Sequence, residues 1–171
     1  PTRLLQVLCS GRNVLYIDMD TVLKKSPLPV IDENYLKGVD ISIAIDKPQT
    51  SDYAHGSDLC TGFVAIKANS KAIHFFSEWE KQCHDEDGYA HNDQLAFNRA
   101  YEASWTKWKE SNTSMVNVEG LSRALFPNGD QYFKVYNESQ REEVILVHAN
   151  WIVGGANKKL NFMKHGLWRP E

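Results

Sequence analysis

The chain has no long hydrophobic run, no even set of cysteines and no strong excess of one charge. No apolar run approaches the roughly 20 residues that a membrane-spanning helix needs, so the sequence predicts no membrane segment in this chain. A net charge of −3 gives no basic surface for nucleic acid or an anionic membrane. The three cysteines, Cys9, Cys60 and Cys83, lack the spacing of a zinc site and leave their disulfide state open.

The sequence also lacks an initiator methionine and a signal peptide, and it begins directly in a predicted helix. From this start we expect a processed or truncated piece of a longer protein. The 171 residues, 42% hydrophobic and 24% charged, suit one globular domain with a sizeable core. No internal repeat or linker divides them, so we expect a single domain over residues 1–171.

The pattern of apolar residues predicts an α/β order of short elements. Strands are expected over residues 14–20, 40–46, 60–68 and 144–147, and helices over residues 2–10, from Ser70, from Asn92 and up to Gly166. Other segments are expected to be irregular: a break at residues 26–29, a surface loop at 47–58, and short extended pieces at 113–136.

The first predicted strand ends in two carboxylates, Asp18 and Asp20. Its apolar run Val14-Leu15-Tyr16-Ile17 is typical of a strand buried on both faces of a parallel sheet, where ligands bind beyond the carboxyl ends. If the strand continues, alternation puts both acids on one face. Two close carboxylates repel unless a cation lies between them, and Mg²⁺ or Mn²⁺ prefers such oxygens. The alternative is a solvated strand end.

His148 ends another buried-type strand, so it is expected at the same sheet edge as the two acids. Two carboxylates and one imidazole make an open metal site with positions free for phosphate oxygens. Gly154 and Gly155 permit close backbone approach to an anion, and Lys158 supplies a positive charge. Together these residues outline a diphosphate site, although singly His148 is typical of a structural histidine and Lys158 of a solvated lysine.

Two further polar motifs lie on predicted elements. Gly62 interrupts the third strand, where the missing side chain allows a ligand to approach the backbone. Asn92 is expected to cap the helix that follows it. Asp93 and Gln94 in the first turn either serve the helix dipole or face a pocket, and the pattern leaves both open.

The motifs taken in order resemble metal-dependent nucleotide-sugar glycosyltransferases of the GT-A fold. The likeness is closest to the nucleotide-diphospho-sugar transferase family that includes plant cell-wall xylosyl- and arabinosyltransferases, and more distant to glycogenin. It runs from Arg3 to Trp168 and rests on Leu15-Tyr16-Ile17-Asp18-Met19-Asp20, Thr61-Gly62-Phe63, Asn92-Asp93-Gln94-Leu95-Ala96-Phe97-Asn98, and His148-Ala149-Asn150-Trp151 with Gly154 and Lys158.

The resemblance implies an α/β, GT-A-like mixed sheet flanked by helices, in the manner of a truncated Rossmann-like fold. It implies a retaining transfer of a sugar from a nucleoside diphosphate sugar to a hydroxyl of a glycan, protein or small molecule. Mn²⁺ (or Mg²⁺) would be held by Asp18, Asp20 and His148. Asp93 and Gln94 would address the transferred sugar or the acceptor. The donor would be contacted by Arg3, Thr61, Gly62, Gly154, Gly155 and Lys158.

The relatives carry, before the helix at residue 2, a βαβ portion that binds the nucleotide base and ribose. We therefore expect this chain to be the C-terminal part of a GT-A fold, either trimmed, completed by a second chain or dimer, or naturally reduced. The compartment follows from none of these: the Golgi lumen suits a eukaryotic type II protein, and the cytoplasm other members.

Two alternatives use the same residues. Asp18 and Asp20 also resemble the nucleophile and general acid of haloacid-dehalogenase-type phosphohydrolases. That interpretation lacks the later acidic pair, since Asp130 has no second acid four residues on, and it leaves His148 without a role. The other alternative is a non-catalytic or degenerate module that binds metal or sugar nucleotide.

Overall fold

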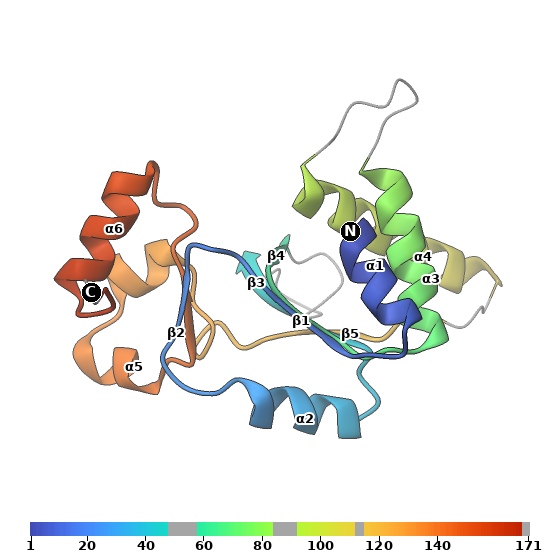
Figure 1. Ribbon diagram of the computed structural model, residues 1–171, viewed down its shortest axis with the longest axis horizontal. Helices are drawn as coiled ribbons and strands as arrows, with labels where there is room; N and C mark the ends of the chain where they lie inside the picture. The colour runs from blue at the N-terminus through green and yellow to red at the C-terminus, as the bar shows by residue number, and fades with distance from the viewer. Residues whose placement is uncertain (48–57, 84–91, 112–114, 169–171) are drawn as a thin grey trace.

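The structure is a computed structural model that describes residues 1–47, 58–83, 92–111 and 115–168. It is an α/β protein with a mixed sheet flanked by helices, as predicted (Figure 1). The elements in chain order are α1 (Thr2–Cys9), β1 (Val14–Ile17), β2 (Thr21–Leu23), α2 (Leu28–Leu36), β3 (Ile41–Lys47), β4 (Asp58–Ile66), α3 (Ser70–Gln82), α4 (Asp93–Ser111), β5 (Val118–Gly120), a π-helix (Gln131–Val135), α5 (Glu138–Glu143), β6 (Leu146–His148) and α6 (Gly155–Lys164).

The central sheet has the strand order β1-β4-β3-β5. β4 runs antiparallel to both of its neighbours, and only β3 and β5 are parallel. The expectation that residues 14–17 form a strand of a parallel sheet is therefore wrong. β1 is instead an edge strand of this sheet, and its Leu15 is 39% exposed, so the strand is not buried on both faces.

Helices α1, α3 and α4 cover one face of this sheet (Figure 1). The sequence predicts Ser70 as the N-cap of helix α3, but Ser70 is its first helical residue, and the cap is Asn69, whose side chain accepts a hydrogen bond from the Ala72 N–H. Trp79 of α3 and Phe97 of α4 pack edge to face, with ring centroids 5.1 Å apart. Each such buried aromatic contributes roughly 1.5–3 kcal/mol. The apolar pattern after Asn92 also predicts that Leu95 packs here, but Leu95 is 46% exposed. The buried face of α4 consists of Ala96, Phe97, Ala100 and Tyr101.

Helix α2 covers the opposite face of the sheet (Figure 1). Residues 26–29 were expected to break regular structure, and this expectation is wrong, because α2 begins there. Proline fits the first helical turn, where its missing N–H has no acceptor to lose and its φ is already helical. Ile31 of α2 is buried with Phe63 and Leu121 in a second core cluster.

A second, smaller sheet pairs β2 with β6 in antiparallel fashion, and Thr21 lies opposite His148. Helices α5 and α6 and the π-helix surround it in a C-terminal lobe (Figure 1). Tyr132, Val147 and Phe162 belong to the core of this lobe. The turn between β1 and β2 therefore joins the two sheets. None of the helices in the described ranges is long and apolar enough to cross a membrane.

Candidate metal and anion site

The two acids lie in the turn that joins the two sheets. The main-chain N–H of Asp18 donates to the Gly62 carbonyl of β4 at 2.9 Å. The Thr21 hydroxyl and N–H donate to the Asp18 carbonyl at 2.7 and 3.3 Å, so the strand ends in a tight turn. The expectation of a continuing strand is therefore wrong. The turn leaves Met19 fully exposed and directs Asp18 and Asp20 toward His148.

His148 is the last residue of β6, and only 6% of its surface is exposed. Its position requires Gly62, because a Cβ at that residue would lie 2.5 Å from His148 Nδ1 and 2.9 Å from Nε2, with Cε1 closer still. The group that approaches the missing side chain is thus this imidazole. The prediction that another group closely approaches Gly62 is confirmed, but that group is the His148 ring and not a ligand.

Asp18, Asp20 and His148 form a compact group of possible metal ligands. His148 Nε2 lies 3.3 Å from Asp20 Oδ1 and 3.6 Å from Asp18 Oδ2. One ligand atom from each residue lies within 4.8 Å of the others. Two carboxylate oxygens and one imidazole suit a Mn²⁺-like or Mg²⁺-like ion, so the residues fit the predicted metal. Their role as ligands stays a prediction.

Lys158 of α6 closes the same group from the C-terminal lobe. Its ammonium lies 2.5 Å from Asp20 Oδ2. Partial burial acts to raise the pKa of Asp20, but the hydrogen bond from Lys158 and the nearby His148 outweigh it and hold that pKa below its usual value. Gly154 precedes α6 with φ of 84°, a conformation that glycine adopts without strain, and Gly155 is the first helical residue. This places Lys158 one turn into the helix.

Tyr16 supports Asp18 from within β1. Its hydroxyl donates to Asp18 Oδ1 at 2.7 Å, and this bond, with burial and the neighbouring carboxylates, raises the pKa of Tyr16 to about 12. The phenol therefore stays protonated and keeps donating at neutral pH. Tyr16 and Asp18 are two residues apart, and the strand alternation predicted through Asp18 was the sequence signal that could have found this contact, although β1 ends at Ile17.

Asp46 forms a second, buried polar centre that sequence reasoning missed. It lies at the end of β3, is 5% exposed, and accepts hydrogen bonds from Asn150 at 2.5 Å and Gln94 at 3.3 Å. Cys60 links this centre to the metal group, since its sulfur is 3.7 Å from Asn150 Nδ2 and 3.5 Å from His148 Nδ1. Burial raises the pKa of the Cys60 thiol, which keeps it uncharged.

The structure brings the remaining predicted residues together in part. Asn92 caps α4 as predicted, by accepting from the Leu95 N–H at 3.0 Å. Thr61 donates to Asp93 Oδ2 at 3.2 Å, so these two meet at the start of α4. Arg3 is exposed and its guanidinium contacts Gln6 within α1. Within the described ranges no hydrogen bond or ion pair joins Arg3 to the metal group.

The fold and the site combine a mixed α/β sheet with an acidic turn at its edge, where a histidine and a lysine from distant parts of the chain converge on the two acids. These features suit a protein that binds a cation and an anion at the edge of a sheet. The chain belongs to the nucleotide-diphospho-sugar transferase family, whose model matches residues 2–163. This match covers nearly the whole chain and decides against the phosphohydrolase alternative.

Curated relatives share this family's chemistry in their names. The chain is 28% identical to UDP-D-xylose:L-fucose alpha-1,3-D-xylosyltransferase 1 of Arabidopsis thaliana, in an alignment covering 98% of this chain and 48% of that protein. It is 29% identical to UDP-galactose:fucoside alpha-3-galactosyltransferase of Dictyostelium discoideum, with 98% of this chain and 27% of that protein covered. The chain thus spans about half or less of the length of these relatives.

Proposed function

We propose that this chain contributes the metal and diphosphate half of a glycosyltransferase that moves a sugar from a nucleoside diphosphate sugar to an acceptor hydroxyl. The observation that carries the proposal is the convergence of Asp18, Asp20 and His148 with the Lys158 ammonium. Acids and a histidine drawn from two sheets are costly to gather unless a cation compensates them. The family match and the names of the relatives supply the chemical class.

The site residues divide the work on the leaving group. Asp18, Asp20 and His148 would hold Mn²⁺ or Mg²⁺. The bound ion supplies positive charge that stabilises the departing diphosphate. Lys158 adds a second cation, and the free N–H groups at the start of α6, from Gly155 onward, favour phosphate oxygens.

The reaction forms a bond from the acceptor oxygen to the anomeric carbon as the bond to the diphosphate oxygen breaks. In the retaining course that we propose, attack comes from the face that the diphosphate leaves, and the acceptor proton passes to the departing phosphate oxygen. Gln94 and Asp93 would orient the transferred sugar, held by their hydrogen bonds to Asp46 and Thr61. No protein nucleophile is required for this course.

The names of the relatives define the first substrates to test. They pair UDP-xylose with fucose and UDP-galactose with a fucoside. We propose a UDP-sugar donor and a fucose-containing acceptor for this chain on that ground.

Calorimetric titration with MnCl₂ and UDP-xylose or UDP-galactose tests the proposal. We expect donor binding that needs the metal and is lost in His148→Ala. Transfer to a fucoside, followed by mass spectrometry, should then show a product larger by one sugar. Metal and donor binding without any transfer would favour the non-catalytic module. Donor binding equal with and without metal, and unchanged in His148→Ala, would contradict the proposal.

A further inference from the structure

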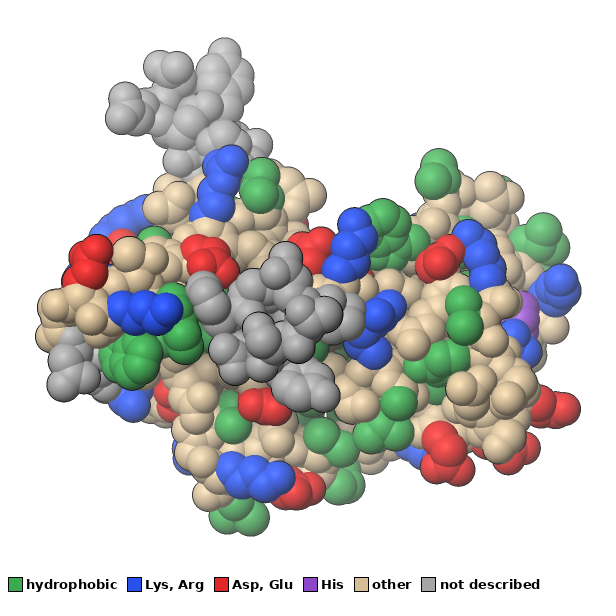
Figure 2. All heavy atoms as spheres, turned by 180° about the vertical axis from the view of Figure 1, so that it is seen from behind, with side chains coloured by type: hydrophobic (Ala, Val, Ile, Leu, Met, Phe, Trp, Pro, Cys, Tyr) green, Lys and Arg blue, Asp and Glu red, His purple; other side chains and the backbone are tan. Residues whose placement is uncertain are grey.

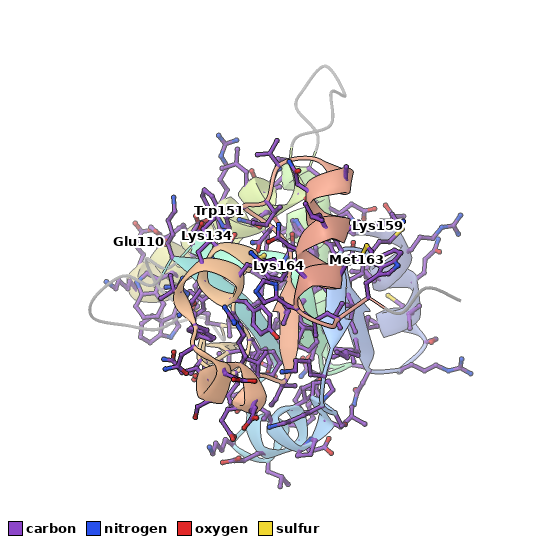
Figure 3. The ribbon with its side chains drawn as sticks, turned by 90° about the vertical axis from the view of Figure 1, so that its left-hand side faces the viewer. Glu110, Lys134, Trp151, Lys159, Met163 and Lys164 are labelled. Atoms are coloured by element: carbon purple, nitrogen blue, oxygen red, sulfur yellow. The ribbon has the colours of Figure 1, made fainter. Side chains whose placement is uncertain are left out.

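A groove lies next to the buried Asp46 centre, on the side of the C-terminal lobe. This open groove has a volume of about 620 Å³, within the roughly 300–1,000 Å³ of small-molecule sites. Its lining includes Asp46, Arg123, Asn128, Gln131 and Trp151. Figure 3 shows Trp151 and Lys134, another lining residue, close together on this side of the molecule. Figure 2 shows the molecule from behind, with a notch in its upper outline between the part that carries α1, α3 and α4 and the C-terminal lobe that carries α6.

Trp151 is held in the groove wall by an unusual backbone. Its φ is 64°, and it is the sole described non-glycine residue with positive φ. A bulky side chain in this left-handed region costs free energy, and such strain concentrates at ligand sites. Trp151 is 52% exposed, and Asn150 before it donates a hydrogen bond to Asp46.

Two buried polar atoms among the groove residues have no hydrogen-bond partner in the part of the chain that the structure describes. Arg123 Nε is a donor and Gln131 Oε1 is an acceptor, and both are buried without a hydrogen bond. Leaving such atoms unpaired is unfavourable, so they indicate a missing polar partner. Hydroxyl groups both donate and accept, so their chemistry suits an unpaired donor on Arg123, an unpaired acceptor on Gln131 and the carboxylate of Asp46, all of which line this groove.

The charges of the groove favour a neutral ligand. Lys134 is paired with Asp130 at 2.5 Å, and the Lys47 ammonium lies over the Trp151 ring, 4.6 Å from its centroid. Asp46 adds a buried negative charge. An anion would meet Asp46 and would find two of the cations already engaged. A polyhydroxylated ring can place its apolar C–H face on an indole and its hydroxyls against the polar wall.

We propose that this groove binds the acceptor as a neutral saccharide stacked on Trp151, with hydroxyls at Asp46, Arg123 and Gln131. The assignment of the saccharide as acceptor rests on the proposed function. Asp46 connects the groove to the reaction site, because it also accepts from Gln94 and from Asn150, two residues from His148. A saccharide in the groove therefore lies beside the residue proposed to orient the transferred sugar.

The test compares Trp151→Gly with Trp151→Phe. Glycine relieves the positive φ and removes the ring, whereas phenylalanine keeps a ring and the strain. The probe is methyl α-L-fucopyranoside, alongside the methyl glycosides of galactose and xylose, followed by saturation-transfer NMR without donor or metal. We expect Trp151→Gly to weaken binding at least tenfold while melting no lower than wild type. Trp151→Phe should retain most of the binding.

Trp168→Ala is the matched control. Trp168 is 42% exposed and carries the Lys159 ammonium 5.2 Å from its ring centroid, as Trp151 carries Lys47. Figure 3 shows Lys159 and Trp151 on opposite sides of α6. Removing this second exposed indole should leave saccharide binding unchanged. Equal losses in Trp168→Ala and Trp151→Gly would mean nonspecific adsorption to exposed indoles and would overturn the proposal.

The remaining outcomes separate this proposal from the proposed function. Wild-type binding retained in Trp151→Gly, or no binding of any of the three glycosides, overturns the groove assignment and leaves metal-dependent donor binding untouched. If inorganic phosphate competes with the glycosides, the groove binds an anion rather than a neutral saccharide, and the groove assignment is overturned. In a further outcome, the protein binds the saccharide and loses that binding in Trp151→Gly, yet binds neither metal nor donor. That result would support the saccharide site in the groove and contradict the proposed transferase activity.

Discussion

Aspartates lie at the ends of two apolar strands of the central sheet, β1 and β3, and their surroundings give these aspartates different tasks. Asp18 and Asp20 follow β1 in an open turn, with side chains 37% and 26% exposed and with His148 and Lys158 close by. Asp46 is the penultimate residue of β3, is nearly fully buried, and accepts hydrogen bonds from the amide groups of Gln94 and Asn150. Partly exposed acids beside an imidazole can exchange a lysine contact for a metal ion. A buried acid surrounded by amide donors fixes the position of other side chains.

The largest effect is expected from Gly62→Ala, which acts on the open centre through His148. The new Cβ would overlap the imidazole and displace it. We expect Mn²⁺ binding to be lost and the free energy of unfolding to fall by about 1–3 kcal/mol. Isothermal calorimetry and urea denaturation measure the two effects.

A double-mutant cycle provides the control for that prediction. In His148→Ala the ring is absent, so adding Gly62→Ala should cost little further stability. Equal destabilisation by Gly62→Ala with and without the His148 ring would show that the glycine serves some purpose other than admitting the imidazole.

Exchanging carboxylate for amide should separate the two centres. Asp20→Asn removes a proposed metal ligand. Loss of a residue that only hydrogen-bonds to a ligand lowers metal affinity roughly 10–100-fold, so we expect a larger fall in Mn²⁺ affinity here, with little loss of stability. Asp46→Asn turns an NH₂ group toward the donors of Gln94 or Asn150 and should lower the free energy of unfolding by about 1–3 kcal/mol. Calorimetry and urea denaturation of both variants show whether Asp20→Asn mainly lowers metal affinity and Asp46→Asn mainly lowers stability. Identical profiles would erase the distinction between the centres.

Acid should weaken the open centre through Asp20. Its pKa is lowered in the folded protein, so its charged form stabilises the fold above the unfolded pKa of about 3.9, and that stability is lost as pH falls through the lower folded value. With metal chelated, wild type should therefore lose more stability than Asp20→Asn between about pH 7 and about pH 3. Because the carboxyl is partly exposed, the difference should stay below about 1 kcal/mol. A smaller loss in wild type than in the variant would reverse the assigned shift.

The smallest effect on metal binding is expected from Tyr16→Phe. This change removes the hydrogen bond to Asp18 and should cost about 0.5–1.5 kcal/mol of stability. Mn²⁺ affinity should fall only a few-fold, because water can replace the phenol at this half-exposed carboxylate. A loss as large as that of Asp20→Asn would place Tyr16 among the groups that the metal site requires.

Much of the site was readable from the sequence because its residues end apolar runs. Asp18, Asp20 and His148 were predicted on that ground and lie together in the structure. The same rule applied to Asp46, which ends the run Ile41-Ser42-Ile43-Ala44-Ile45, but it was not used there. The α/β class and most helices followed from apolar periodicity.

The rest could not be read because it depends on tertiary contacts. The direction of a strand relative to its neighbours is set by pairing with distant segments. The four residues of β1 therefore did not indicate that this strand is antiparallel and lies at the sheet edge. The φ of Trp151 and the closeness of Cys60 to His148 arise from segments far apart in the chain. A proline-containing segment can end one helix or start another, and only the packing of Ile31 in the second core cluster decided for α2.

The central claim is that Asp18, Asp20 and His148 hold one divalent cation. Electron paramagnetic resonance of free Mn²⁺, titrated with the protein, measures this directly. The account predicts one saturable site in wild type, with the free Mn²⁺ signal restored by Mg²⁺ in excess and no saturable site in His148→Ala. An undiminished free signal with wild type, or equal binding by His148→Ala, would contradict it and leave the three side chains as an ion-pair cluster with Lys158.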